Sequence, residues 1–244
     1  MKIPTLQGNI KRRILVNYQA DPNVVQKILP KGFRPKLRKG KAIAGICLIR
    51  LEHIRPNFAP EFLGLSSENA AHRIAVEWEG NDETKEGVYV PRRDTDSFIN
   101  AAVGGRFFPG EHHKADFEVS EKKGEINFSM KSNDKTAFVK LHGKTGEQFP
   151  DNSIFSSLAE ASSFFEKGSL GYSATEAGKT LDGIELEIKD WKVEPLVLDF
   201  VESSFYDDET IFPKGSIKFD HALLMKNIAH EWHSAKSFDL EKQT

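Results

Sequence analysis

Apolar residues recur along this chain mainly with the two-residue period of a half-buried β-strand. Between residues 73 and 79, Ile74, Val76 and Trp78 fall on one face, and mainly charged residues fall on the other. The run from Ala42 to Ile49 is apolar on both faces, which predicts a strand that is covered on both sides. Similar segments predict further strands at residues 14–18, 184–200 and 216–219, and a three-stranded meander around Phe117–Val119, Ile126–Met130 and Ala137–Leu141.

Helical signals occur in three places between these strands. Asp21 and Pro22 supply an N-cap and a proline at the first helical position, which predicts a short helix ending at Pro30. Residues 153–167 carry apolar side chains at helical spacing and are followed by a capping glycine, so they predict a longer helix. Residues 220–230 also look helical.

Together these elements predict an α+β fold. We expect a β-rich, antiparallel sheet that is curved or closed into a barrel, with the helices packed outside. No low-complexity linker or repeat of fixed period interrupts the 244 residues, which favours a single domain with loose ends at about 1–8 and 233–244.

Composition narrows the classes of partner. The net charge of -2 and the pI near 6.5 give no field that would attract nucleic acid. The longest apolar run is far too short to span a bilayer, and the first residues lack the features of a secretory signal. We therefore expect a cytoplasmic protein, in which the single cysteine, Cys47, is a buried packing residue rather than a reactive thiol.

The segment from Gly110 to Lys114, Gly-Glu-His-His-Lys, concentrates ionisable groups where a glycine-rich stretch meets a predicted strand. If Lys114 faces an apolar cavity beside a protonated imidazole, both effects lower the pKa of its amine and favour attack on a carbonyl. The alternative is a solvated loop in which His112 and His113 cap backbone groups. Neighbouring residues of an extended segment point to opposite sides, so these two histidines do not predict a metal site.

Three further groups are candidates for a site. Arg92 and Arg93 follow a predicted strand beside two aspartates, and their guanidinium groups suit either a carboxylate ligand or structural ion pairs. Glu68 and His72 precede the strand at 73–79, and either is a candidate to face a cavity. The sequence His-Glu-Trp-His at 230–233 lacks the spacing of a zinc-protease helix, which leaves a terminal segment or a binding role open. No metal and no cofactor are predicted.

Several stretches resemble acetoacetate decarboxylase. Residues 11–30 combine a basic cluster, the sequence ILVNYQAD and a helix ending at a proline, like the opening of that enzyme. Residues 103–114, with Arg106 ahead of a basic pair, resemble its active-site segment. Residues 87–93 and 220–225 are closer to an uncharacterised branch of the acetoacetate-decarboxylase-like superfamily, a domain of unknown function. The resemblance spans about residues 11–230.

The resemblance implies roles for individual residues. In the decarboxylases one lysine forms a Schiff base with a β-keto acid, and the neighbouring lysine lowers the pKa of that amine. Acetoacetate decarboxylase is itself a standard example of a lysine activated by a neighbouring cation. Matching the segment places His113 at the Schiff-base position and Lys114 beside it. The family's N-terminal arginine falls near Lys11, its acidic site residue falls near Glu68, and a second carboxylate meets the apolar run near Ile46. Family members also assemble, so the resemblance implies a homo-oligomer.

Two hypotheses follow. The first is an enzyme acting on a small keto or carboxylic acid, with Lys114, His113 and Glu68 as its catalytic residues. The second is a non-catalytic protein that binds a small organic acid in the same barrel cavity. On both hypotheses the ligand is expected to contact a set of basic side chains, namely Lys11, Arg13, Arg92, Arg93, Arg106 and His112.

Overall fold

Long strands form the frame of the molecule. A computed structural model of the protein describes residues 4–80, 83–97, 110–175 and 179–241. Five long strands lie side by side in the order β13, β1, β4, β5, β6. Their bounds are β1 Leu6–Ala20, β4 Lys41–Pro56, β5 Leu65–Glu79, β6 Thr84–Thr95 and β13 Ile217–Asp239.

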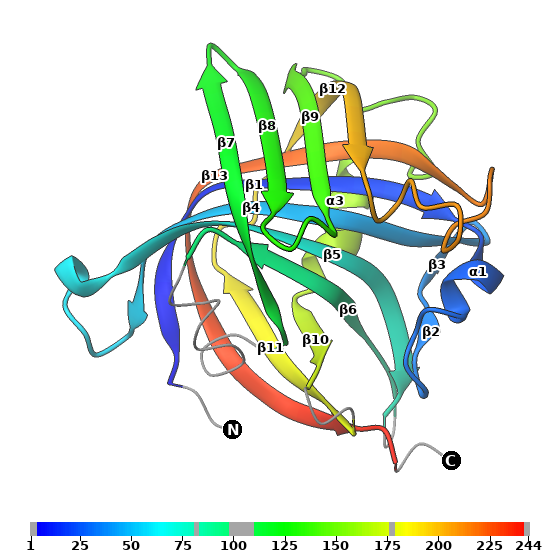
Figure 1. Cartoon of the computed structure of the whole chain (residues 1–244), viewed down its shortest axis with the longest axis horizontal. Helices are drawn as coiled ribbons and strands as arrows, with labels where there is room; N and C mark the ends of the chain where they lie inside the picture. Colours follow the sequence, from blue (N-terminus) through cyan, green and yellow to red (C-terminus); the bar gives the residue numbers. More distant parts are fainter. Residues whose placement is uncertain (1–3, 81–82, 98–109, 176–178, 242–244) are drawn as a thin grey trace.

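Shorter strands join the two edges of this central sheet. The meander β7 His112–Lys122, β8 Glu125–Ser132 and β9 Phe138–Thr145 continues through β12 Glu194–Ser203 to the first half of β13. β10 Leu170–Ala174 and β11 Thr180–Ile188 connect β6 to the second half of β13. The sheet therefore curves into a ring, and Figure 1 shows β13 crossing above the other long strands before it bends down beside β11. Two short strands, β2 Arg34–Pro35 and β3 Leu37–Arg38, complete it.

Both faces of the central strands are buried. On one face, Ile14, Leu48 and other buried residues pack against the meander through Phe128 in a first core. On the other face, Leu15 and neighbouring residues pack against Phe165 and the rest of a helical segment in a second core. Because side chains alternate along a strand, neighbouring residues of β1 and β4 belong to different cores.

The helices begin as their caps dictate. α1, Pro22–Gln26, starts after Asp21, whose side chain accepts a hydrogen bond from the backbone N–H of Asn23, as predicted. α3, Leu158–Glu166, starts five residues later than the sequence pattern predicted, with Ser157 as its N-cap. Residues 153–157 are held instead by β13, because Asp220 accepts hydrogen bonds from the Ser153 hydroxyl and the backbone N–H of residue 154. None of the helices in the described residues is long and apolar enough to cross a membrane.

The prediction of a helix at residues 220–230 is wrong. These residues lie in β13, and Asp220 to Met225 are buried because β13 lies between β1 and β12. A strand that is apolar on both faces cannot be separated from a buried helix by its hydrophobic period alone, and residues such as Ala222 and Leu223 favour helix intrinsically. Tertiary pairing decided the outcome. Residues 6–8 and 233–239, which were expected among the loose ends, lie in β1 and β13.

The predicted fold class is confirmed, with two refinements. The molecule is β-rich, its sheet is curved, and α3 covers the second core from outside. The sheet is mixed rather than wholly antiparallel, because β6 pairs in parallel with both β7 and β10. The predicted strand at 184–200 is divided into β11 and β12, which pair with different parts of β13.

Tyr206 ties two central strands together, and its removal provides a test of the fold. Its buried hydroxyl lies 3.0 Å from the Gly45 nitrogen, 2.8 Å from the Gly45 carbonyl oxygen and 3.0 Å from the Arg73 carbonyl oxygen. Tyr206→Phe leaves these buried backbone groups without that partner, so we expect a loss of about 1–3 kcal/mol in unfolding free energy. The matched variant Tyr172→Phe removes a single bond to the Lys236 carbonyl and should cost less. Equal losses in urea titrations would contradict this role.

Candidate functional site

Four neighbouring strands place a row of side chains on the second-core face of the sheet. Cys47 of β4 is in register with Ala71 of β5, which is in register with Arg93 of β6, which is in register with His112 of β7. Residues in register point to the same face. Arg13 of β1 joins this row, because its Nε donates to the Cys47 sulfur at 3.3 Å.

These residues enclose a cavity of about 70 Å³. Arg13, Cys47, Arg93 and His112 line it together with Leu186 of β11 and Trp232 of β13. Ile49, Leu51, Asn69, Ala70, Ala71 and Asp94 complete the lining. Leu186 and Trp232 come from β11 and from the second half of β13, which pair with each other, so the cavity is lined by strands from both ends of the chain.

Among the residues that the structure describes, the cavity has a cationic wall without a facing carboxylate. Asp94 lines it, but the Asp94 carboxylate points to the first-core face, where Arg92 Nε and Nη2 donate to it at 3.0 and 2.8 Å. Arg93 Nε donates to the Ser173 hydroxyl at 3.3 Å, a neutral partner. Arg13 stacks over the Trp191 ring at 5.7 Å. The charges of Arg13 and Arg93 are thus left to be balanced by something other than an acidic side chain of the cavity lining.

Burial shapes the charge states of this wall. It lowers the pKa of Arg93 to about 10, so the guanidinium stays protonated at neutral pH. Burial and the charge of Arg93 lower the pKa of His112 to about 3, so its imidazole is neutral at pH 7. Arg73, on β5 beneath Phe165, is buried in the same core, and burial lowers its pKa to about 10. An anionic ligand would offset the cost of keeping these cations away from water.

Several predicted site residues lie on the opposite face. His113 Nδ1 lies 2.9 Å from an Asp134 carboxylate oxygen. Glu68 pairs with the buried Arg12 at 2.5 Å, and burial raises the pKa of Glu68 even though Arg12 opposes that shift. Arg92 forms the structural ion pair with Asp94. The alternation along β5, β6 and β7 therefore separates Glu68, Arg92 and His113 from the arginine-lined cavity.

The remaining predicted residues are placed as follows. Lys114 is on the same side of β7 as His112, but its Nζ donates to the Asp96 backbone carbonyl and it is not among the cavity-lining residues. Lys11 is exposed on β1. Arg106 lies outside the described residues, as does the rest of 98–109. The structure therefore brings Arg13, Arg93 and His112 together and does not place Lys114 and His113 on one face.

Sequence reasoning missed two contributors to the cavity. Cys47 is buried as predicted, but its sulfur forms part of the cavity wall beside Arg13. For Trp232 the sequence left a terminal segment or a binding role open, and the structure places it in the cavity lining on β13. The signal for Cys47 is the register of β4 with β5, β6 and β7, whereas the signal for Trp232 requires knowing that Ile217–Asp239 is a strand.

The solved structures with the same arrangement of strands share one fold. Acetoacetate decarboxylase from Legionella pneumophila matches with a TM-score of 0.59 at 14% identity, over 97% of this chain and 88% of that one. An acetoacetate decarboxylase-like enzyme from Sphingomonas wittichii matches with a TM-score of 0.60 at 11% identity, over 98% and 93%. The enduracididine biosynthesis enzyme MppR, complexed with pyruvate, matches with a TM-score of 0.59 at 13% identity, over 100% and 93%. The chain thus has the acetoacetate-decarboxylase-like fold.

The sequence itself defines the family. Residues 9–214 match the family DUF2071, described as an uncharacterized conserved protein. Because the match covers most of the chain, the protein belongs to this family, and the predicted resemblance to a domain-of-unknown-function branch with this fold is confirmed. No match was found among curated proteins.

The depressed pKa of His112 predicts how stability depends on pH. Above about pH 6.5 the imidazole is neutral in both the folded and the unfolded chain. Below that pH the unfolded chain binds a proton that the folded protein takes up only near its folded-state pKa of about 3, so stability is lost as pH falls through this window. We expect His112→Gln to reduce the slope of unfolding free energy against pH between 6 and 4 by up to about 1.4 kcal/mol per pH unit. Identical slopes in urea titrations of both proteins would refute the assignment.

Proposed function

We propose that this protein binds a small organic acid, with keto acids as the favoured class, in the cavity lined by Arg13, Arg93 and His112. The observation that carries the proposal is a half-buried wall with two guanidinium groups and, among the described residues, no facing carboxylate. A carboxylate suits such a wall because it accepts charge-assisted hydrogen bonds from a guanidinium fork.

Cavity size supports a small ligand. A volume of about 70 Å³ accommodates roughly five water-sized groups, which fits a molecule of the size of pyruvate. The apolar lining residues Leu186 and Trp232 suit a short carbon chain rather than a second charged group. MppR, which has the same fold, was solved in complex with pyruvate, and this supports a ligand of that class here.

Neutral His112 supplies a further polar contact. Because its pKa is lowered to about 3, the imidazole offers one N–H donor or one acceptor at pH 7 without a charge. Its Nδ1 lies 3.2 Å from the Gly110 carbonyl oxygen, which suits a tautomer with the proton on Nδ1. The neutral ring adds no positive charge to the cavity wall, so recognition of the ligand's charge is left to Arg13 and Arg93.

A pair of lysine substitutions tests the cavity. Arg92 and Arg93 are adjacent on β6 but face opposite cores, so the same change at each position is a matched comparison. We expect Arg93→Lys to weaken pyruvate binding by about tenfold, since the planar fork is lost while the charge is kept. Arg92→Lys should leave the affinity within about twofold. Isothermal titration calorimetry measures both, and equal losses, or no binding by the wild-type protein across a panel of keto acids, would overturn the proposal.

A second candidate is an enzyme in which Lys114 forms an imine with the bound keto acid. Its position two residues from His112, on the same side of β7, favours this candidate. In that reaction the Lys114 amine attacks the ketone carbon and water leaves, which gives a C=N bond. The present hydrogen bond from Nζ to the Asp96 carbonyl has to be broken first.

Borohydride trapping separates the two candidates. Reduction of an imine leaves a stable secondary amine, so treatment with pyruvate and borohydride should add the mass of the reduced adduct to the peptide containing Lys114. The adduct should be absent from Lys114→Ala, while pyruvate binding through Arg13 and Arg93 persists in that variant. Binding without any adduct in the wild-type protein would eliminate the imine enzyme and leave the binding protein.

A further inference from the structure

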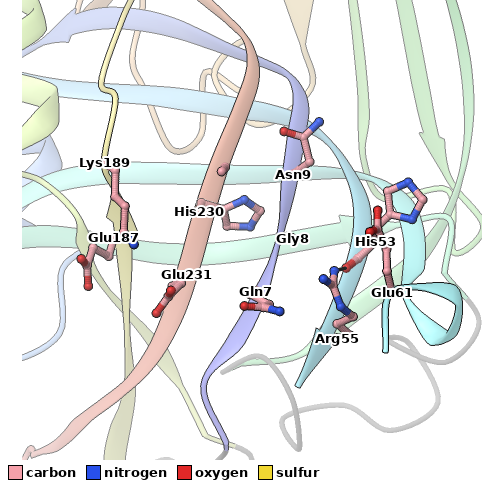
Figure 2. Close-up of a pocket in the computed structure, with 11 residues that line it drawn as sticks. Gln7, Gly8, Asn9, His53, Arg55, Glu61, Glu187, Lys189, His230 and Glu231 are labelled. Atoms are coloured by element: carbon pink, nitrogen blue, oxygen red, sulfur yellow. Dashed lines mark hydrogen bonds between the residues drawn. The ribbon is translucent and has the colours of Figure 1, made fainter. Parts of the chain in front are cut away.

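A second cavity lies on the outer side of the strands that close the first one. It has a volume of about 290 Å³ and is lined by residues of β1, β4, β11 and β13, drawn in Figure 2. Glu187 and Glu231 belong to this lining, whereas their neighbours Leu186 and Trp232 line the arginine-lined cavity. Strand alternation therefore gives the same two strands an acidic side and an apolar side.

Three metal-binding side chains meet at the edge of this second cavity. Glu187 of β11 is directly in register with Glu231 of β13, and His233 is two residues further along β13. All three therefore lie on one face, and Figure 2 shows the two glutamates on neighbouring strands. The donor atoms of the three residues lie within 4.8 Å of one another.

The distances match those between ligands around one ion. His233 Nε2 is 3.2 Å from the nearer Glu187 carboxylate oxygen and 3.5 Å from that of Glu231. A tetrahedral ion with bonds of about 2.0–2.1 Å separates its ligand atoms by about 3.4 Å. Within the described residues, Nε2 has no partner aligned for a hydrogen bond, even though both carboxylates are close. Both His233 distances are thus close to the separation of two ligand atoms on one ion, and the two carboxylates approach Nε2 without an aligned hydrogen bond.

The imidazole is also oriented for coordination. Its other nitrogen, Nδ1, lies 3.3 Å from the Thr5 hydroxyl, which fixes the ring and leaves Nε2 directed at the carboxylates. Such a second hydrogen bond on the far nitrogen is the usual support of a metal-binding histidine. The two glutamates face each other across the strand pair, and a cation between them removes the repulsion of their like charges.

We propose that Glu187, Glu231 and His233 bind a divalent transition-metal ion of the zinc type. A nitrogen ligand together with two carboxylates favours this class over calcium and magnesium, which prefer oxygen ligands. Three protein ligands leave a coordination position open, and the cavity beside Glu187 and Glu231 gives access to it. The site is independent of organic-acid binding in the arginine-lined cavity.

Zinc titration of the full chain, without a histidine tag and after treatment with a chelator, tests this site. Calorimetry should show one Zn²⁺ bound per chain, and His233→Ala and Glu187→Gln should each weaken it by at least about tenfold. The matched control is His142→Ala, because His142 faces a single carboxylate, Asp199, at 2.6 Å on another part of the surface. That variant should retain the wild-type affinity.

Cobalt provides a spectroscopic readout that is independent of calorimetry. Co²⁺ bound by one nitrogen and two carboxylates with an open position should give visible absorption bands that are lost in His233→Ala and retained in His142→Ala. The proposal would be overturned if the wild-type protein does not bind Zn²⁺, or if His233→Ala and Glu187→Gln bind it as strongly as the wild-type protein does. Because Glu187 is exposed at the surface, its substitution leaves the core intact, and circular dichroism of each variant verifies the fold.

Discussion

The alternation of side chains along strands that are buried on both faces governs this molecule. β13, β1, β4 and β5 have cores on both sides, so each residue is assigned to one core or the other by its parity along the strand. As a consequence for function, ionisable residues that are adjacent in sequence face different cores. Arg92 stabilises Asp94 in one core while Arg93 faces a cavity in the other, and the same division separates His113 from His112.

Sequence patterns predicted the elements whose two-residue period is visible locally. The strands around Ile14, Ile46 and Ile74 and the meander were found because their apolar positions and turn residues agree. Residues 220–230 of β13 were assigned to a helix because residues 222–225 are apolar on both faces and favour helix, and the deciding factor was their position between β1 and β12. The overall fold class survived this error, since one misassigned segment did not alter the dominance of strands.

The candidate site was predictable only in part, for the same reason. Arginines near the ends of strands indicated a site for a carboxylate ligand, and Arg13, Arg93 and His112 do line one cavity. The sequence left two uses open for the pair at 92–93, ligand contact and ion pairing, and the structure assigns ion pairing to Arg92 and leaves Arg93 facing the cavity. Cys47 and Trp232 line the same cavity although more than 180 residues separate them in the sequence. Strand pairing brings them together, and no local sequence pattern indicates that pairing.

Because parity decides which residues line each cavity, the register of β13 has to be fixed firmly. A slip by one residue would turn Glu187 or Glu231 toward the arginines and Trp232 toward the acidic side. Polar contacts at the start of β13 oppose such a slip. Asp220 accepts hydrogen bonds from Gln19 at 2.8 Å and from the segment before α3, and His221 lies 3.0 Å from the Asn17 amide on β1. A slip would leave these buried groups without partners, at a cost of about 1–3 kcal/mol each, so a polar network outside the lining of either cavity keeps the arginine-lined and acidic sides of β13 distinct.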